Sequence, residues 1–426
     1  MIDMKELQSR KDEIAENIAN RGMNIDLNAL LDSQKQRSAL LQETETLRAK
    51  RNEHATSMKQ KLDPEVRATL IAEGKALKET IAEKEQLLQE VEAQYQSLAK
   101  SVPNYAHPDA PIGKLDTDNR EIRTWGTIPT FSFETKDHVQ LGEDLDLIDF
   151  DTATRVSGSK FYYLKNEAVL LELALERFAL AVLQKHGFTL TITPDIAREE
   201  ILEGIGFNPR GEETNIYTVE GTGTCLVGTA EITLGGYHAG QILNENDLPI
   251  RLAGLSHCFR REAGGAGQYS KGLYRVHQFS KVEMFVYSHP DQSDEVHQQL
   301  LAIEEEIFQS LNIPYRVVDT CTGDLGAPAY RKFDIEAWMP GRGESGAYGE
   351  VTSTSNCTDY QARRLQIRYR DNDGKIQYVH LVNGTAIAVS RAIVAILENN
   401  QMADGSVVVP EVLVPYMGCT EIRPKQ

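Results

Sequence analysis

The 426-residue sequence lacks an apolar run long enough to cross a membrane, since a spanning helix needs about 20 such residues in succession. Its N-terminal segment is charged from the third residue onward, so we expect no secretory signal. The five cysteines lie far apart and form no C-x-x-C pair, which argues against a zinc site built on paired thiols. Isolated thiols suit a reducing compartment, and we expect a cytoplasmic protein.

Common nucleotide and metal signatures are also absent. The chain has no G-x-x-x-x-G-K-[ST], no G-x-G-x-x-G after a strand and no H-E-x-x-H, so neither a P-loop nor a dinucleotide-binding turn is indicated. Basic residues are outnumbered, 45 against 63 acidic ones, for a net charge of −18. That balance alone argues against nucleic-acid binding, but a local basic patch can still bind.

Proline and glycine are scarce over residues 1–102, which contain only Pro64, Gly22 and Gly74. This region is rich in helix formers. Apolar residues recur there with the 3.5-residue period of a coiled coil, strongly at Leu70, Leu77, Ile81, Leu88, Val91, Tyr95 and Leu98 and more weakly at Leu40, Leu47 and Met58. Between the two sets, Asp63 and Pro64 form a helix start. We predict either an antiparallel helical hairpin with its tip near residue 63 or a dimerising coiled coil, which the periodicity supports equally.

A basic cluster lies close to the expected tip, with Glu53 as the one acidic residue among five basic ones. The cluster comprises Arg48, Lys50, Arg51, Lys59 and Lys61. On an acidic chain it is a candidate contact for nucleic-acid phosphates, although most such runs are solvated helix faces.

The amino-acid composition of the chain changes after residue 102. Four prolines with several Asp and Asn residues indicate a linker over residues 103–130. From residue 131 to 426, short alternating strands mix with a few helices. This order predicts an α+β fold with a mainly antiparallel sheet in the second part.

Two strand-like runs, residues 250–260 and 274–287, flank a glycine-rich loop and are expected to form a long-looped hairpin. Alternation along the second run places cations, a carboxylate and aromatic rings on one face, namely Arg275, His277, Phe279, Lys281, Glu283 and Phe285. An aromatic ring beside arginines can clamp a purine, and Arg260 can grip a carboxylate or phosphate. A polar, solvent-facing strand is the alternative.

Residues 259–264 (FRREAG), 272–279 (GLYRVHQF) and 281–284 (KVEM) resemble the second signature of class II aminoacyl-tRNA synthetases, in the form of the seryl-tRNA synthetase family. The resemblance implies that Arg260 holds the substrate carboxylate and the α-phosphate of ATP. It implies that Glu262 faces the adenine amino group, that Phe279 stacks on adenine and that Glu283 receives the serine amino group or hydroxyl. The same segment implies ATP contacts at Arg261 and at the backbone of Val276.

Residues 382–391 (VNGTAIAVSR) are expected to form a strand that turns at Asn383-Gly384, followed by a helix that is apolar nearly all round except for Arg391. A buried guanidinium needs an anionic partner, commonly a structural carboxylate. The segment resembles the third class II signature, which implies instead that Arg391 contacts the γ-phosphate and the far face of adenine. Asn383 and Thr385 would then meet the serine hydroxyl. Three positions depart from the family pattern and concern packing: Ala386, Ser390 and Asn400.

Residues 348–356 (YGEVTSTSN) resemble the family's ATP and magnesium segment. A carboxylate with a hydroxyl suits a hard cation that also takes phosphate oxygens. The family pattern selects Glu350 and Ser353 for Mg²⁺, whereas strand alternation selects Glu350 and Thr352, so the family choice requires a bulge. Val351 and Thr352 are also expected beside ATP.

Thr229, Ala230 and Glu231 resemble the family's serine-pocket T-A-E, although T-A-E also suits a helix start with Thr229 as N-cap. Residues 170–186 and 187–194 resemble the first class II signature, which implies a homodimer interface; a core helix is the alternative.

Beside these matches, the N-terminal hairpin resembles the family's antiparallel coiled-coil arm, which contacts tRNA. The resemblance implies a helical tRNA-binding arm at 1–102, a linker at 103–130 and a class II catalytic domain at 131–426. The implied reaction is activation of L-serine with ATP and Mg²⁺ to seryl-adenylate, then transfer of serine to tRNA(Ser), and to tRNA(Sec) where that tRNA exists.

Two other functions remain open at this point. A class II homologue that loads a carrier protein would lack the arm. A coiled-coil adaptor with a decayed site would have lost Arg260, Glu283 or Arg391, and all three are present.

Overall fold

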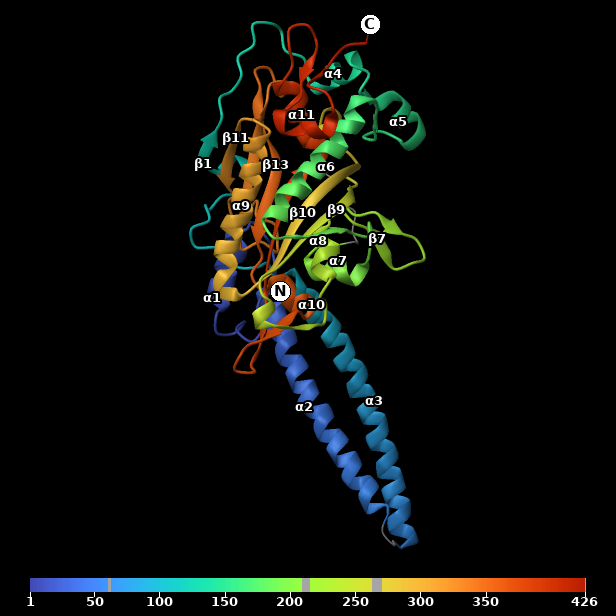
Figure 1. Ribbon diagram of the computed structural model, residues 1–426. Coiled ribbons are helices and arrows are strands. Elements are labelled where there is room, and N and C mark those ends of the chain that lie inside the picture. The colour runs from blue at the N-terminus through green and yellow to red at the C-terminus, as the bar shows by residue number, and fades with distance from the viewer. Residues whose placement is uncertain (60–62, 209–214, 263–269, 426) are drawn as a thin grey trace. The chain divides into compact units, whose positions relative to one another are not determined.

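The computed structural model describes residues 1–59, 63–208, 215–262 and 270–425, in two compact units that divide after Pro103 (Figure 1). The first unit, Met1–Pro103, is helical, with α1 (Lys11–Asn20), α2 (Leu27–Ser57) and α3 (Pro64–Ser101). The described strands all belong to the second unit, Asn104–Gln426. No described helix combines the length and apolarity that a bilayer crossing would need.

Helices α2 and α3 pair antiparallel within one chain. Contacts that advance along α2 retreat along α3, as in the pairs Arg37–Glu92, Arg48–Glu85 and His54–Glu73. The predicted apolar seam of α3 is buried or half-buried throughout. Asp63 caps α3 by accepting a hydrogen bond from the Glu65 N–H at 3.1 Å, with Pro64 in the first turn. The antiparallel hairpin is therefore confirmed over the coiled coil formed between chains.

An eight-stranded sheet organises the second unit, in the order β1-β11-β12-β13-β16-β10-β9-β4. Every neighbouring pair is antiparallel except β4 and β9, which run parallel. The mainly antiparallel sheet is thus confirmed. Its strands are β1 (Arg120–Trp125), β4 (Thr189–Ile192), β9 (Ile250–Phe259), β10 (Gln278–Ser288), β11 (Tyr315–Asp319), β12 (Arg331–Met339), β13 (Ala347–Asn356) and β16 (His380–Ala388).

The segment 103–130 differs from the linker expected there. Residues 120–125 form β1, which pairs with β11 at the edge of the large sheet, and Asn104 onward groups with the second unit. The proline-rich stretch therefore leads into a strand of the sheet.

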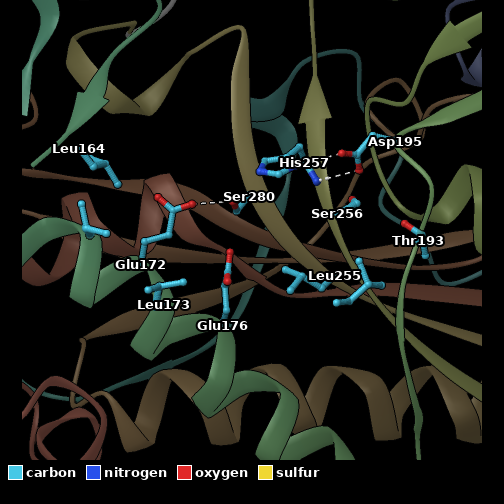
Figure 2. Close-up of a pocket in the computed structure, with 12 residues that line it drawn as sticks. Leu164, Glu172, Leu173, Glu176, Thr193, Asp195, Leu255, Ser256, His257 and Ser280 are labelled. Carbon is cyan, nitrogen blue, oxygen red and sulfur yellow. Dashed lines mark hydrogen bonds and ion pairs between the residues drawn. The ribbon is translucent and has the colours of Figure 1, made fainter.

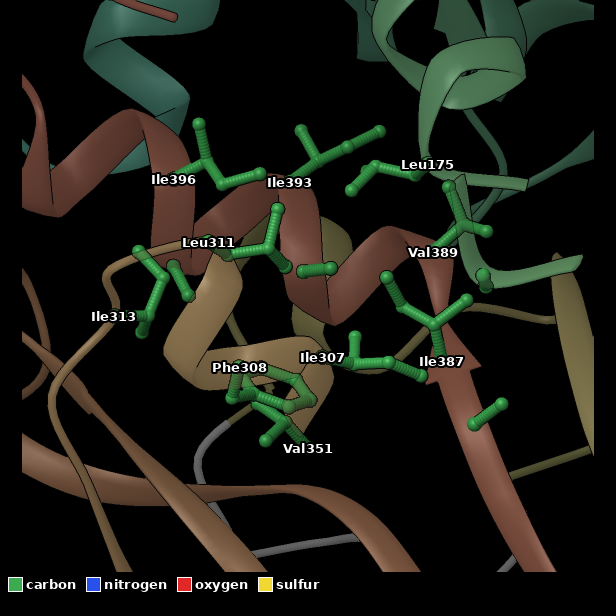
Figure 3. Close-up of a cluster of buried hydrophobic side chains, with 14 of the residues drawn as sticks. Leu175, Ile307, Phe308, Leu311, Ile313, Val351, Ile387, Val389, Ile393 and Ile396 are labelled. Atoms are coloured by element: carbon green, nitrogen blue, oxygen red, sulfur yellow. The ribbon is translucent and has the colours of Figure 1, made fainter. Parts of the chain in front are cut away.

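Strand β10 separates two hydrophobic cores by the alternation of its side chains. Val282, Met284 and Val286 point toward α6 (Glu167–Lys185), α9 (Ser293–Ser310) and α11 (Val389–Asn399). Figure 3 shows side chains of α9 and α11 meeting strand residues of this core. On the opposite face, Phe285 and Tyr287 join the core around α7 (Glu199–Ile205), α8 (Glu231–Gly236) and α10 (Tyr360–Leu365). Near the N-terminal end of β10, the side chains on this second face line the candidate active site.

Shorter elements complete the second unit. The helices are α4 (His138–Asp144), α5 (Phe150–Ser157) and α12 (Val414–Met417). The small sheets contain β2 (Ile148–Asp149) with β3 (Tyr163–Leu164); β5 (Ile196–Arg198), β7 (Thr224–Leu226) and β6 (Thr218–Val219); β15 (Ile376–Tyr378), β14 (Arg368–Arg370) and β8 (Ile242–Asn244); and β17 (Val407–Val408) with β18 (Glu421–Ile422).

The turn predicted at Asn383-Gly384 is wrong, because β16 continues through both residues to Ala388. The lack of a side chain at Gly384 instead allows neighbouring side chains to pack closely against the strand. A Cβ there would lie 2.7 Å from Glu304 Oε1 and 2.9 Å from Thr354 Oγ1. The Asn-Gly pair carries a turn signal in isolation, but burial in the middle of the sheet decides the conformation.

Candidate active site

A cavity over β10, β13 and β16 collects residues that are far apart in the sequence. Its lining comes from the end of β9, the segment before β10, three central strands and the start of α11: Arg260, Glu262, Tyr274, Arg275, Val276, Phe279, Lys281, Glu350, Val351, Thr352, Ser353, Thr385, Ala388, Ser390 and Arg391. Most residues of the predicted ATP site therefore lie together. The glycine-rich loop over residues 263–269 lies outside the described residues.

One wall of the cavity pairs an arginine with an aromatic ring. The Arg260 guanidinium lies 5.2 Å from the centroid of Phe279, and its Nε donates to the Gly228 carbonyl at 3.2 Å. The Glu262 carboxylate accepts from Arg275 at 3.0 Å. Arg261 is exposed, so its contact with ATP stays a prediction.

A second wall is built around Arg391. Its guanidinium donates to the Glu350 carbonyl at 2.9 Å and to the Glu350 carboxylate at 3.0 Å, and lies 4.7 Å from the Tyr274 ring centroid. Burial raises the pKa of Glu350, but the charges of Arg391, Lys332 and Arg260 more than offset it, so that pKa lies below its usual value. The carboxylate expected as the alternative partner of Arg391 is thus Glu350 itself, at the cavity.

A buried ion pair underlies the region of the predicted serine pocket. Lys281 Nζ lies 2.5 Å from Glu283 and donates to the Thr229 hydroxyl at 2.6 Å. The Thr385 hydroxyl donates to the same Glu283 oxygen, Oε2, at 3.2 Å. Lys281 and Glu283 are only 5% and 2% exposed, so each charge depends on its partner.

Glu231 completes this pocket from α8. Its Oε1 accepts hydrogen bonds from Gln361 at 2.8 Å and Asn383 at 3.2 Å. Burial, with the nearby charge of Glu283, raises the pKa of Glu231 to about 7. The Thr229 hydroxyl also accepts from the Glu231 N–H at 3.2 Å, so the helix-start and pocket interpretations of T-A-E hold together.

The bulge required in β13 is present. Ile335 pairs with Thr352 while the next residue, Glu336, pairs with Glu350, which leaves Val351 as the extra residue. Such a bulge shifts the alternation of side chains. The Thr352 hydroxyl donates to Glu304 of α9 at 2.8 Å, whereas Ser353 hydrogen-bonds Asp334. Glu350 and Ser353 therefore share the face away from α9.

A magnesium ion would fit this face if protein side chains and phosphate oxygens coordinate it together. Across the described ranges, no group of three or more His, Cys, Asp or Glu side chains is placed to hold a metal by itself. Glu350 is ionised and lines the same cavity as Ser353, and phosphate oxygens would supply the remaining ligands that Mg²⁺ requires.

The basic cluster of the arm is largely exposed. Arg48 pairs with Glu85 at 2.6 Å, while Lys50, Arg51 and Lys59 are exposed. Lys61, also predicted to bind tRNA, lies outside the described residues.

The α6 face carries a second, more apolar cavity of about 410 Å³, shown in Figure 2. Leu173 of α6 and Ile192 of β4 line it, although they are 51% and 83% exposed. Polar contacts frame the cavity: Ser280 donates to Glu172 at 2.6 Å, and His257 bonds Asp195 at 3.0 Å (Figure 2). The core-helix alternative therefore describes only one side of α6.

For three groups at the site the sequence predicted no role. Lys281 had a signal, since it lies between Phe279 and Glu283 on the predicted strand face. Tyr274 and Gln361 had none, because the strand alternation put Tyr274 on the opposite face and Gln361 reaches Glu231 only through the packing of α10 against α8.

Comparisons with known proteins agree with this geometry. The family model "Seryl-tRNA synthetase N-terminal domain" matches residues 1–106, and "tRNA synthetase class II core domain (G, H, P, S and T)" matches residues 217–400. A serine--tRNA ligase of Treponema denticola is 61% identical over 422 residues, covering 99% of this chain and 100% of that protein.

Two solved structures are similar over nearly the whole chain. Seryl-tRNA synthetase from Pyrococcus horikoshii complexed with ATP has a TM-score of 0.90 and 43% identity, with 100% of both chains covered. Cytoplasmic serine-tRNA ligase from Naegleria fowleri in complex with AMP has a TM-score of 0.83 and 30% identity, covering 97% of this chain and 95% of that one.

Proposed function

The chain belongs to the seryl-tRNA synthetase family, and on that premise we propose which residues carry each step of its reaction. The enzyme activates L-serine with ATP and transfers serine to tRNA. This excludes the carrier ligase and the adaptor as alternatives. The observation behind the proposed roles is that Arg260, Phe279 and Arg391 line one cavity together with Lys281, which forms an ion pair with Glu283.

In the first step, a serine carboxylate oxygen attacks the α-phosphorus of ATP, the bond to the β-phosphate breaks, and pyrophosphate leaves. Arg260 holds the serine carboxylate and the α-phosphate while Phe279 stacks on adenine. Arg391 exchanges its contact with Glu350 for the γ-phosphate. Such fixed charges stabilise the charge that develops on the phosphates without reorganisation.

Magnesium, when bound by Glu350 and Ser353, supplies positive charge to the phosphate oxygens. The residues that hold it are preorganised, since the β13 bulge puts both on one face. Before ATP binds, the charges of Arg391 and Lys332 keep Glu350 ionised and thus available as a ligand.

Serine selection depends on buried polar groups that need a partner. The pocket comprises Thr229, Ala230, Glu231, Glu283, Asn383 and Thr385. Glu283 receives the serine amino group or hydroxyl, and alanine, which lacks the hydroxyl, would leave a polar group unpaired. Sites of this kind reject such analogues strongly.

In the second step, a terminal ribose hydroxyl of tRNA attacks the carbonyl of seryl-adenylate and AMP leaves. The α2–α3 arm contacts tRNA(Ser) through its exposed cations Lys50, Arg51 and Lys59. We extend the substrate to tRNA(Sec) where that tRNA exists, assign the chain to the cytoplasm, and propose a homodimer formed through the exposed face of α6.

Pyrophosphate exchange measured with a panel of amino acids tests the proposed roles. We expect exchange with serine, charging of tRNA(Ser), and loss of exchange by at least 100-fold in Arg260→Ala and Arg391→Ala. An Arg391→Ala enzyme that exchanges normally would contradict the assigned role of Arg391.

A further inference from the structure

A larger polar cavity, of about 430 Å³, adjoins the ATP site beside Arg391 and Glu350. The two cavities share Tyr274, Arg275, Glu350 and Arg391. Four arginines line the larger one: Arg275, Arg316, Arg342 and Arg391. Ion pairs in this lining include Arg275–Glu262 at 3.0 Å, Arg316–Glu336 at 2.7 Å and Arg391–Glu350 at 3.0 Å.

Arg342 and Arg391 contact the same aromatic ring as well as lining the same cavity. Each guanidinium lies 4.7 Å from the centroid of Tyr274. The ring attracts both cations, but two like charges held on one ring repel one another. A multiply charged anion in the cavity would relieve that repulsion, and guanidinium groups match phosphate oxygens in geometry.

Gly349 makes room for the Arg342 guanidinium. A Cβ at position 349 would lie 2.7 Å from Arg342 Nη1, closer than side chains tolerate. Gly349, which directly precedes Glu350 in β13, thus determines where the Arg342 guanidinium can lie.

The backbone next to Arg342 is fixed by a buried pair. His138 Nδ1 lies 2.7 Å from Glu398 Oε1, and both residues are fully buried. The other Glu398 oxygen accepts from the Gly341 N–H at 2.8 Å, and His138 Nε2 accepts from the Leu273 N–H at 3.2 Å. One pair therefore holds the backbone neighbours of both Arg342 and Tyr274, so the arginine is positioned before any anion arrives.

We propose that Arg342 binds the β- and γ-phosphates of ATP, and the pyrophosphate product, as a second guanidinium beside Arg391. The proposal rests on the proposed function, because that function directs the phosphate tail toward Arg391. It assigns the larger cavity to pyrophosphate and leaves the binding of adenine to Phe279.

Calorimetric titration of the full-length protein with ATP, AMP and pyrophosphate tests the role of Arg342. Arg342→Ala removes one charge-assisted hydrogen-bond donor, so we expect affinity for ATP and pyrophosphate to fall roughly 10- to 100-fold. Affinity for AMP, which has neither β- nor γ-phosphate, should stay within twofold. Equal losses for ATP and AMP, or no loss for either, would overturn the proposal.

A second variant moves the guanidinium without removing its charge. Gly349→Ala should displace Arg342 and reproduce the loss for ATP with AMP unchanged. The double variant should be no weaker than Arg342→Ala alone; additive losses would count against a shared cause.

Arg363→Ala is the matched control, since that arginine also lies 4.7 Å from a tyrosine ring, Tyr378, outside both cavities' linings. It should bind ATP normally. Serine-dependent exchange by the unaltered enzyme tests the proposed function separately, because exchange requires no particular role for Arg342.

Discussion

Single carboxylates at this site have different charge states because their surroundings differ. The cations around Glu350 outweigh its burial and lower its pKa. Burial raises the pKa of Glu231 to about 7 and that of Asp334 to about 6, against the partial compensation of neighbouring polar and charged groups. An ionised carboxylate thus lines the proposed magnesium and phosphate site, while a partly protonated one lies in the proposed serine pocket.

The raised pKa of Glu231 makes stability depend on pH. Between the unfolded value of 4.5 and the folded value of about 7, the folded state binds more protons. Stability therefore falls as pH rises through this window, by roughly 1–3 kcal/mol for this group. Glu231→Gln should match the unaltered enzyme in urea unfolding at pH 4.5 and exceed it in stability at pH 8.

The exposed Glu411→Gln serves as control for this experiment and should leave the pH profile unchanged. A Glu231→Gln protein whose stability falls with pH as steeply as the unaltered one would show that other groups cause the dependence.

Individual site residues differ in how far the sequence alone could identify them. Phe279 and Glu283 follow from alternation along one strand, and Arg260 from its place at a strand end. Arg342 carries no such signal, since its position depends on a missing side chain at Gly349 and on a buried pair from two distant helices. Contacts set by tertiary packing leave no periodic trace in the sequence.

At the scale of elements, the β13 bulge puts the Ser353 hydroxyl, rather than that of Thr352, on the face of the proposed magnesium site. Ser353→Ala should raise the KM for ATP about tenfold at limiting Mg²⁺ and also lower stability, because the Ser353 hydroxyl hydrogen-bonds buried Asp334. Thr352→Val should leave the KM for ATP unchanged. It removes the hydroxyl that donates to buried Glu304 and should cost about 1–3 kcal/mol of stability.

Steady-state kinetics and urea unfolding of both variants check this assignment. Each variant serves as the control for the other, since they remove adjacent hydroxyls from one strand. A Thr352→Val enzyme with the weaker ATP binding would reverse the assignment.

The periodic helices of the arm were more predictable than strands whose sequence carries turn or proline signals. The 3.5-residue period predicted the arm, and the Asp63-Pro64 pair predicted where α3 begins. The strand through Asn383-Gly384 and the strand β1 were missed. In both cases burial and strand pairing in the sheet override a local turn or proline signal. Burial and strand pairing cannot be read from a single sequence.

For the whole molecule, the arm should determine tRNA binding without affecting activation. Lys50→Glu with Arg51→Glu should raise the KM for tRNA about tenfold or more at low salt and reduce the salt dependence of binding. Pyrophosphate exchange with serine should stay within twofold. Tenfold weaker exchange would contradict a separate role for the arm.

Charge reversal elsewhere controls for the change in net charge. Arg370→Glu with Lys375→Glu alters two exposed cations of the second unit. This variant should charge tRNA with an unchanged KM.

The exposed α6 face predicts assembly of two chains. Light scattering should give twice the 47.6 kDa mass of one chain. Leu173→Asp should yield monomers, because it places a charge in a desolvated interface. Val408→Asp, at a residue of β17 that is 39% exposed, should remain dimeric. A monomeric unaltered enzyme would contradict the proposed homodimer.

Strand β10 has consequences for how such an enzyme can diversify. Successive residues of this strand serve chemistry on one side and hold the helices on the other. A substitution at Lys281 or Glu283 that changes which amino acid is bound would leave the other residue of the pair as an uncompensated buried charge. We therefore expect evolutionary or engineered changes of specificity to require paired substitutions at Lys281 and Glu283 rather than single ones.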